Sequence, residues 1–280
     1  MKRKLRIEVA GHIVGLNIDE ESHASFVKDV LEAYDAFLSD AEPALSVDVE
    51  LTRDAPPEYF PFSKLVFKDG AMVIEDDCLL GSLDFSKRRG RIKLNPLNPL
   101  YPLGTFLRNL YTFLVVLEDG GIALHAAGVL EGEEAHVFIG PSTAGKSTVA
   151  GLSPGRVILS DDLILAKKVD GEFKVFPTPA WGDRQIGPRQ NKPYRIKGLF
   201  KLIKDKTVYL ERFSPAYALA NLFTVPHIPA GLIPGDGLLA AFSELLSAVP
   251  CYGLHFLPEP SFWLHIEGLK SEIAFSKREN

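Results

Sequence analysis

Cysteine is scarce in this chain, with only Cys78 and Cys251 among 280 residues. Two cysteines can form one disulfide at most. Such sparse use is more typical of a reducing compartment than of a secreted domain held together by disulfides. The composition therefore favours a cytoplasmic protein.

A strong net charge is also missing, because 31 Lys and Arg residues nearly balance 36 Asp and Glu residues. This balance argues against a nucleic-acid-binding surface. No uncharged apolar run is long enough to span a membrane. The basic start at 1–4 resembles the flank of a signal peptide, but Glu8 and Asp19 interrupt the stretch that follows. We therefore expect a soluble protein with neither a nucleic-acid nor a membrane partner.

Near the middle of the chain, one stretch has the spacing of a phosphate-binding loop, or P-loop: Gly140-Pro141-Ser142-Thr143-Ala144-Gly145-Lys146-Ser147-Thr148. Glycines at both ends allow the backbone to curl so that its N–H groups converge on phosphate oxygens. Lys146 supplies a positive charge for the β- and γ-phosphates, and Ser147 offers a hydroxyl to Mg²⁺. An apolar strand is expected at 136–139 and a short helix from 146 onward. The alternative is a surface turn rich in Gly and Ser.

The first 95 residues predict a small, mostly antiparallel α+β domain with one helix at 25–38. Alternating apolar residues predict its strands, at 5–10, 13–18, 45–51, 64–68, 71–75, 79–85 and 91–94. The acidic cluster at 75–77 is interpreted as a solvated turn. Prolines between 95 and 102 rule out regular structure there, so the predicted domains are 1–95 and 96–280.

The second part begins with a predicted apolar helix at 103–117. A hairpin of 122–130 and 135–139 then leads into the P-loop, so we expect a mixed sheet. A long loop is expected at 177–193 and a tail at 270–280. Later helices are predicted at 214–223 and 236–248, and strands at 156–162, 163–169, 172–176, 196–203, 207–210, 252–257 and 262–266.

Two carboxylates, Asp161 and Asp162, follow an apolar strand that comes soon after the P-loop. A carboxylate at a strand end can complete a Mg²⁺ shell, and a second one can accept the proton of an attacking hydroxyl. Neighbouring residues on a strand point to opposite faces, so both can serve one site only if the backbone turns there. The alternative is that one of them merely caps the turn. For His125, on the first hairpin strand, a buried structural histidine is the alternative to a site residue.

Three stretches together resemble the HPr serine kinase/phosphorylase family: Leu124-His125-Ala126-Ala127-Gly128-Val129, the loop at 140–148, and Ile158-Leu159-Ser160-Asp161-Asp162. That family shares its nucleotide-binding core with ATP-dependent phosphoenolpyruvate carboxykinase. The chain is similar, over roughly residues 100–268, to HPr kinase-like proteins of bacterial peptide-modification clusters, including lasso peptide kinases. The resemblance implies a mixed α/β, α+β-like fold: a P-loop core with a largely antiparallel mixed sheet, plus the small N-terminal domain.

The resemblance also implies a phosphotransferase that uses ATP and Mg²⁺ to phosphorylate a hydroxyl, expected to be serine, of a peptide or protein. Lys146 and the backbone of 140–148 would hold the ATP phosphates, and Ser147 and Asp162 would lie at the metal. Asp161 would deprotonate the acceptor, and His125 would orient the phosphates or the acceptor. Family members are often oligomers, so a homo-oligomer is an open expectation.

No motif decides which arginine would stabilise the transferring phosphoryl group. The candidates are Arg184, Arg189 and Arg195. Asp183 is a positional candidate for a further metal ligand.

Two residues depart from the family pattern. Thr143 stands where glycine is usual, and because positive φ is costly for a β-branched residue we expect it at negative φ. Thr148 replaces an acidic residue, and the family's long signature segment is not recognisable, so neither HPr as acceptor nor the reverse reaction is expected. Two other hypotheses compete with the kinase. One is a nucleotide-binding sensor or scaffold without catalysis; the other, a carboxykinase, fits a chain of this length poorly.

Overall fold

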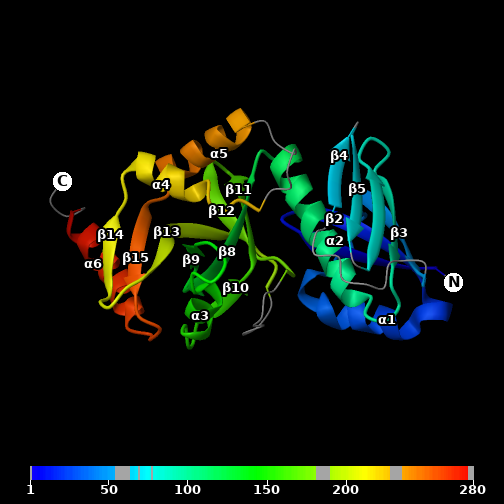
Figure 1. Cartoon of the computed structure of the whole chain (residues 1–280), viewed down its shortest axis with the longest axis horizontal. Helices are drawn as coiled ribbons and strands as arrows, with labels where there is room; N and C mark the ends of the chain where they lie inside the picture. Colours follow the sequence, from blue (N-terminus) through cyan, green and yellow to red (C-terminus); the bar gives the residue numbers. More distant parts are fainter. Residues whose placement is uncertain are drawn as a thin grey trace. The chain divides into compact units, whose positions relative to one another are not determined.

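A computed structural model describes residues 2–53, 64–68, 70–76, 78–180, 190–227 and 235–276. The chain is mixed α/β, and the described residues form six α-helices and two mixed β-sheets (Figure 1). It divides into two compact units, the first built mainly from Met1–Asp119 and the second from most of the chain after Gly120.

The first unit has a seven-stranded sheet of order β1-β2-β3-β7-β6-β5-β4. β3 pairs in parallel with β2 and β7, and the other pairings described in this sheet are antiparallel. The predicted strands are confirmed, with bounds β1 Lys2–Val9, β2 His12–Asp19, β3 Leu45–Leu51, β4 Lys64–Lys68, β5 Ala71–Asp76, β6 Leu79–Asp84 and β7 Arg89–Leu94. They form because every second side chain is apolar and buried, as in Leu45, Val47 and Val49 of β3.

Two helices belong to this unit: α1 (Glu20–Ala33), followed by a 3₁₀ turn at Asp35–Phe37, and α2 (Leu100–Phe113), which continues as a π-helical turn at Leu114–Glu118. The hydroxyl of Tyr111 in α2 donates a 2.7 Å hydrogen bond to the Ile7 carbonyl in β1. α2 is therefore fixed to the first unit.

This attachment corrects the predicted domain boundary. The division lies between Asp119 and Gly120, and not at residue 95, because α2 buries its apolar side chains in the first unit. The stretch Leu100–Glu118 is long and apolar enough to cross a membrane, but most of it is buried within the protein. That burial is typical of a core helix.

The second unit has an eight-stranded sheet. Its strands are β8 Ile122–Glu131, β9 Glu134–Ile139, β10 Val157–Ser160, β11 Leu163–Val169, β12 Glu172–Phe176, β13 Tyr194–Lys204, β14 Tyr209–Arg212 and β15 Cys251–Phe256. β13 pairs in parallel with β9 and β15, whereas the other described pairings are antiparallel. The expected hairpin of β8 and β9 and the largely antiparallel mixed sheet are confirmed.

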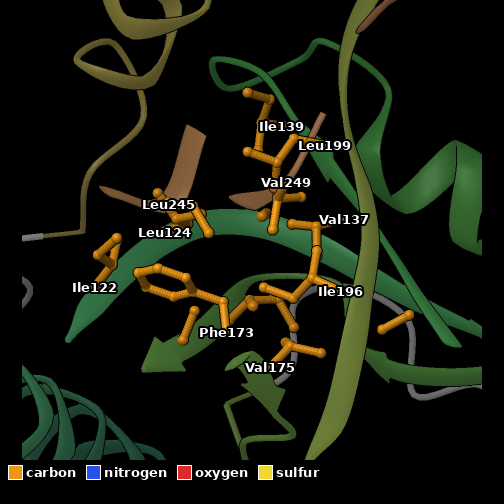
Figure 2. Packing of buried hydrophobic residues seen from close by; sticks show 14 of the residues in the cluster. Ile122, Leu124, Val137, Ile139, Phe173, Val175, Ile196, Leu199, Leu245 and Val249 are labelled. Atoms are coloured by element: carbon orange, nitrogen blue, oxygen red, sulfur yellow. The ribbon is translucent and has the colours of Figure 1, made fainter. Parts of the chain in front are cut away.

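The pairings β8–β9, β9–β13, β13–β12, β12–β11 and β11–β8 close a ring of five strands. The apolar side chains inside this curved sheet, among them Ile122, Val137 and Phe173, converge in Figure 2. Helices α4 (Pro215–Leu222) and α5 (Gly235–Ala248) add Leu222 and Leu245 to the same cluster. The hydroxyl of Ser214 caps α4 as predicted, by accepting from the Tyr217 N–H.

A second cluster covers the other face of this sheet, with side chains from α3 (Lys146–Gly151) and α6 (Phe262–Ser276). The predicted strand at 262–266 is wrong, and the predicted tail from 270 is helical as far as Ser276. Phe262, Trp263 and Ile266 are buried while Leu264 is exposed, a spacing that suits one face of a helix. The indole N–H of Trp263 donates to the Ser153 hydroxyl at 3.0 Å, which links α6 to the end of α3.

Candidate functional site

Strand register brings the predicted site residues to one end of the β8–β9 hairpin. β9 ends at Ile139, directly before the P-loop, and Ile139 pairs with Ala126 of β8. His125, which precedes Ala126 on β8, therefore lies beside Gly140, the first residue of the loop. On its other side, β8 pairs His125 with Leu163, so Asp162 comes next to His125.

The start of the P-loop is a tight turn. The Ala144 N–H donates to the Pro141 carbonyl at 3.1 Å, closing a four-residue β-turn. A Cβ atom placed on Gly140 would lie 2.6 Å from the Cβ of Ala144, so only glycine fits there. The loop thus needs its first glycine for close packing against the Ala144 side chain.

Thr143 corrects an expectation, because its φ is +68° and not negative. It is the third residue of the Pro141–Ala144 turn, a position at which a type II turn requires positive φ. The turn hydrogen bond and the crowding at Gly140 fix this geometry, and threonine must adopt it. Backbone strain of this kind typically costs about 1–3 kcal/mol.

The last glycine of the loop also has a steric role. Gly145 has a φ of +110° and directly precedes α3. A Cβ atom at this position would lie 2.9 Å from the ring of Phe256 in β15. Gly145 therefore combines a left-handed backbone with close approach to the sheet.

Lys146 is folded back on the loop. Its ammonium donates to the carbonyls of Gly140 and Pro141, at 3.0 Å each, and the residue is buried. Burial lowers the pKa of Lys146, and the nearby Lys201 ammonium lowers it further, whereas Asp162 and then Asp161 raise it. The loop thus holds a poorly solvated cation that an anion could stabilise.

Ser160 makes both aspartates available to one site. Its hydroxyl accepts from the N–H groups of Asp162 and Leu163, at 3.2 Å each, and donates to the Ala180 carbonyl at 2.7 Å. This turn separates β10 from β11, so the strict alternation of a strand stops at Ser160. Asp161 and Asp162 both line the same cavity.

The two carboxylates differ in their surroundings. Asp161 is 2% exposed, and Asp162 is the partner with the greater effect on the pKa of Lys146. The Nδ1 atom of His125 lies 3.7 Å from a carboxylate oxygen of Asp162, and the His125 side chain is 40% exposed. His125 is therefore not a buried structural histidine, and its ring faces Asp162.

A cavity of about 380 Å³ unites these groups. It is lined by His125, Ser142, Thr143, Gly145, Lys146, Ser147, Thr148, Asp161 and Asp162. Its volume lies within the range of small-molecule sites. Among the described residues no group of three or more His, Cys, Asp and Glu side chains could hold a metal ion alone. A hydroxyl and two carboxylates nevertheless suit Mg²⁺, which is usually held by one or two carboxylates together with phosphates and water.

Of the three candidate arginines, the structure describes Arg195. Arg184 and Arg189 lie outside the described residues, as does Asp183. Arg195 pairs with Glu134, at the start of β9, whereas the P-loop follows the other end of that strand. Five residues of β-strand span about 16 Å, so Arg195 lies too far from the loop to serve it.

Lys201 is the residue that β13 places at the P-loop end, because it pairs with Ile139. No sequence motif identifies Lys201 as a site residue. Lys201 is one of several basic residues in β13, and the pairing of β13 with β9 could not be derived from the sequence.

No protein-family model matches the chain, and no curated protein matches it. The function is therefore inferred from the residues of the cavity.

Proposed function

We propose that the chain is an ATP- and Mg²⁺-dependent phosphotransferase of the HPr kinase-like type, acting in the cytoplasm on a hydroxyl, expected to be serine, of a peptide or protein. The observation that carries the proposal is the shared cavity, where P-loop residues Lys146 and Ser147 meet Asp161 and Asp162. A phosphate-binding loop alone would indicate only nucleotide binding. The two carboxylates supply what the transfer of a phosphoryl group also requires.

In the proposed reaction the loop backbone and Lys146 hold the phosphates of ATP. Bound Mg²⁺ would neutralise charge on the phosphates, with Ser147 and Asp162 as its protein ligands. Asp162 raises the pKa of Lys146 more than Asp161 does, which supports a position of Asp162 beside the phosphates.

Asp161 would take the proton of the acceptor hydroxyl. The acceptor oxygen forms a bond to the γ-phosphorus while the bond to the bridging oxygen breaks, leaving ADP. His125 would orient the acceptor or the phosphates through its position against Asp162. Most of the rate would come from positioning and charge stabilisation.

The direct test incubates the protein with γ-labelled ATP, Mg²⁺, and the peptides and proteins encoded beside its gene, then locates label by mass spectrometry. We expect one labelled hydroxyl, and loss of labelling in Lys146→Ala and Asp161→Asn. Asp170→Asn is a matched control, because Asp170 lies in the exposed turn between β11 and β12 of the same unit. Labelling that persists in both site variants would exclude the proposal.

The competing hypothesis is a nucleotide-binding sensor or scaffold that transfers no phosphate. Tight ATP binding that depends on Lys146, without any labelled acceptor, would favour it. The same experiment therefore separates the two functions.

A further inference from the structure

Lys201 lies on the strand that neighbours the P-loop strand. β13 and β9 run parallel, and Lys201 pairs with Ile139, the residue before Gly140. Neighbouring strands are about 4.8 Å apart. The side chain of Lys201 is therefore long enough to reach the start of the loop. This is the side of β9 opposite to β8, which carries His125.

The ammonium of Lys201 points toward a segment that also borders His125. Its Nζ atom lies 3.4 Å from the Thr224 hydroxyl. The next residue, Val225, accepts a 2.9 Å hydrogen bond at its carbonyl from the His125 N–H. Lys201 and His125 therefore contact neighbouring residues of one segment, Thr224 and Val225.

Lys201 and Lys197, which lie on the same strand, differ in the groups that their ammonium groups contact. Lys197 forms an ion pair with Glu134 at 3.0 Å. Within the described ranges of the chain, no carboxylate forms such a pair with Lys201, whose hydrogen-bond partner is the neutral Thr224 hydroxyl. Burial lowers the pKa of Lys201, and its charge in turn lowers the pKa of Lys146. The charges of Lys146 and Lys201 therefore repel each other, and a bound polyanion would offset that repulsion.

We infer that Lys201 is a second cation of the phosphate site, binding an oxyanion of the phosphate chain from strand β13. This assignment rests on the proposed nucleotide-binding function and extends it to a residue outside the loop motif. Lys146 and Lys201 then form a pair of charges across the start of the loop.

The test compares Lys201→Gln, Lys201→Arg and the control Lys197→Gln by calorimetric titration with Mg²⁺-ATP and with inorganic tripolyphosphate. We expect Lys201→Gln to weaken the binding of both ligands about tenfold, as for the loss of one charged hydrogen bond. Lys201→Arg, which keeps the charge, should restore most of the affinity. Lys197→Gln should bind like the wild type, because Lys197 is paired with Glu134 at the far end of β9.

Unchanged affinity for both ligands in Lys201→Gln would overturn the inference. So would weaker binding of ATP alone, since it would place the contact at the nucleoside. These results differ from failure of the proposed function, in which the wild type would bind neither ligand or Lys146→Ala would bind like the wild type. Circular dichroism of each variant verifies that the fold is intact.

Discussion

Replacement of Thr143 by glycine should stabilise the protein, although it removes a side chain. Thr143 adopts a φ of +68°, in the left-handed region that glycine enters without steric cost. For a residue with a Cβ atom that region costs about 1–2 kcal/mol. The greater freedom of glycine in the unfolded chain offsets about 0.4–1 kcal/mol of the relief. Since the Thr143 side chain is exposed, little packing is lost.

The net gain worked from these terms is about 1 kcal/mol in the free energy of unfolding. It should be measured by urea denaturation without nucleotide, followed by circular dichroism, and by the thermal midpoint, which should rise about 2–4 °C. Thr148→Gly is the matched control, because Thr148 is equally exposed but lies inside α3 with helical backbone angles. It should destabilise by a few tenths of a kcal/mol. Destabilisation by Thr143→Gly as large as that by Thr148→Gly would show that Thr143 carries no such backbone strain.

The remaining predictions concern the cavity and the two thiols. Lys146→Ala should weaken Mg²⁺-ATP binding at least about tenfold in a calorimetric titration, because a charged contact to phosphate is lost. Asp161→Asn should lower the rate of phosphate transfer about 10²–10⁴-fold while ATP affinity stays near that of the wild type, as expected for a general base; parallel loss of binding would contradict that role. Burial raises the pKa of Cys251 to about 12, so Ellman's reagent at pH 8 should label the partly exposed Cys78 quickly and Cys251 only after unfolding. Since folding raises this pKa, the Cys251 contribution to stability is present below about pH 9 and is lost as the pH rises toward about 12.

Much of the fold could be predicted from local patterns. Alternating burial identified strands such as β3, and turn residues separated β11 from β12, because both signals act between near neighbours in sequence. The strand predicted at 262–266 was wrong because a short apolar run suits a buried strand and a helix equally well. The predicted boundary at 95 followed the prolines, whereas the actual division follows the burial of α2, which depends on tertiary contacts.

Site residues could be predicted only where a single local motif or the end of a single strand identifies them. The loop at 140–148 and the adjacent aspartates met this condition, and the cavity brings them together with His125. Arg195 and Lys201 lie on the same strand. Only the pairing of β13 with β9 shows that Arg195 is far from the loop and that Lys201 is beside it. That pairing joins segments about 60 residues apart, and no local pattern specifies it.

Strain and desolvation are concentrated in the same few residues of the loop. Thr143 is held in a costly backbone conformation, and Lys146 is buried beside the charge of Lys201. These features lower the stability of the free protein, and the surrounding turn and strands must compensate for them. A polyanion bound at the loop would offset the repulsion between the lysines, so part of its binding free energy would come from relieving the free protein. Thr143→Gly relieves only the backbone and leaves both lysines in place. It should therefore raise stability without removing the ability to bind phosphate, and the two properties can be separated by experiment.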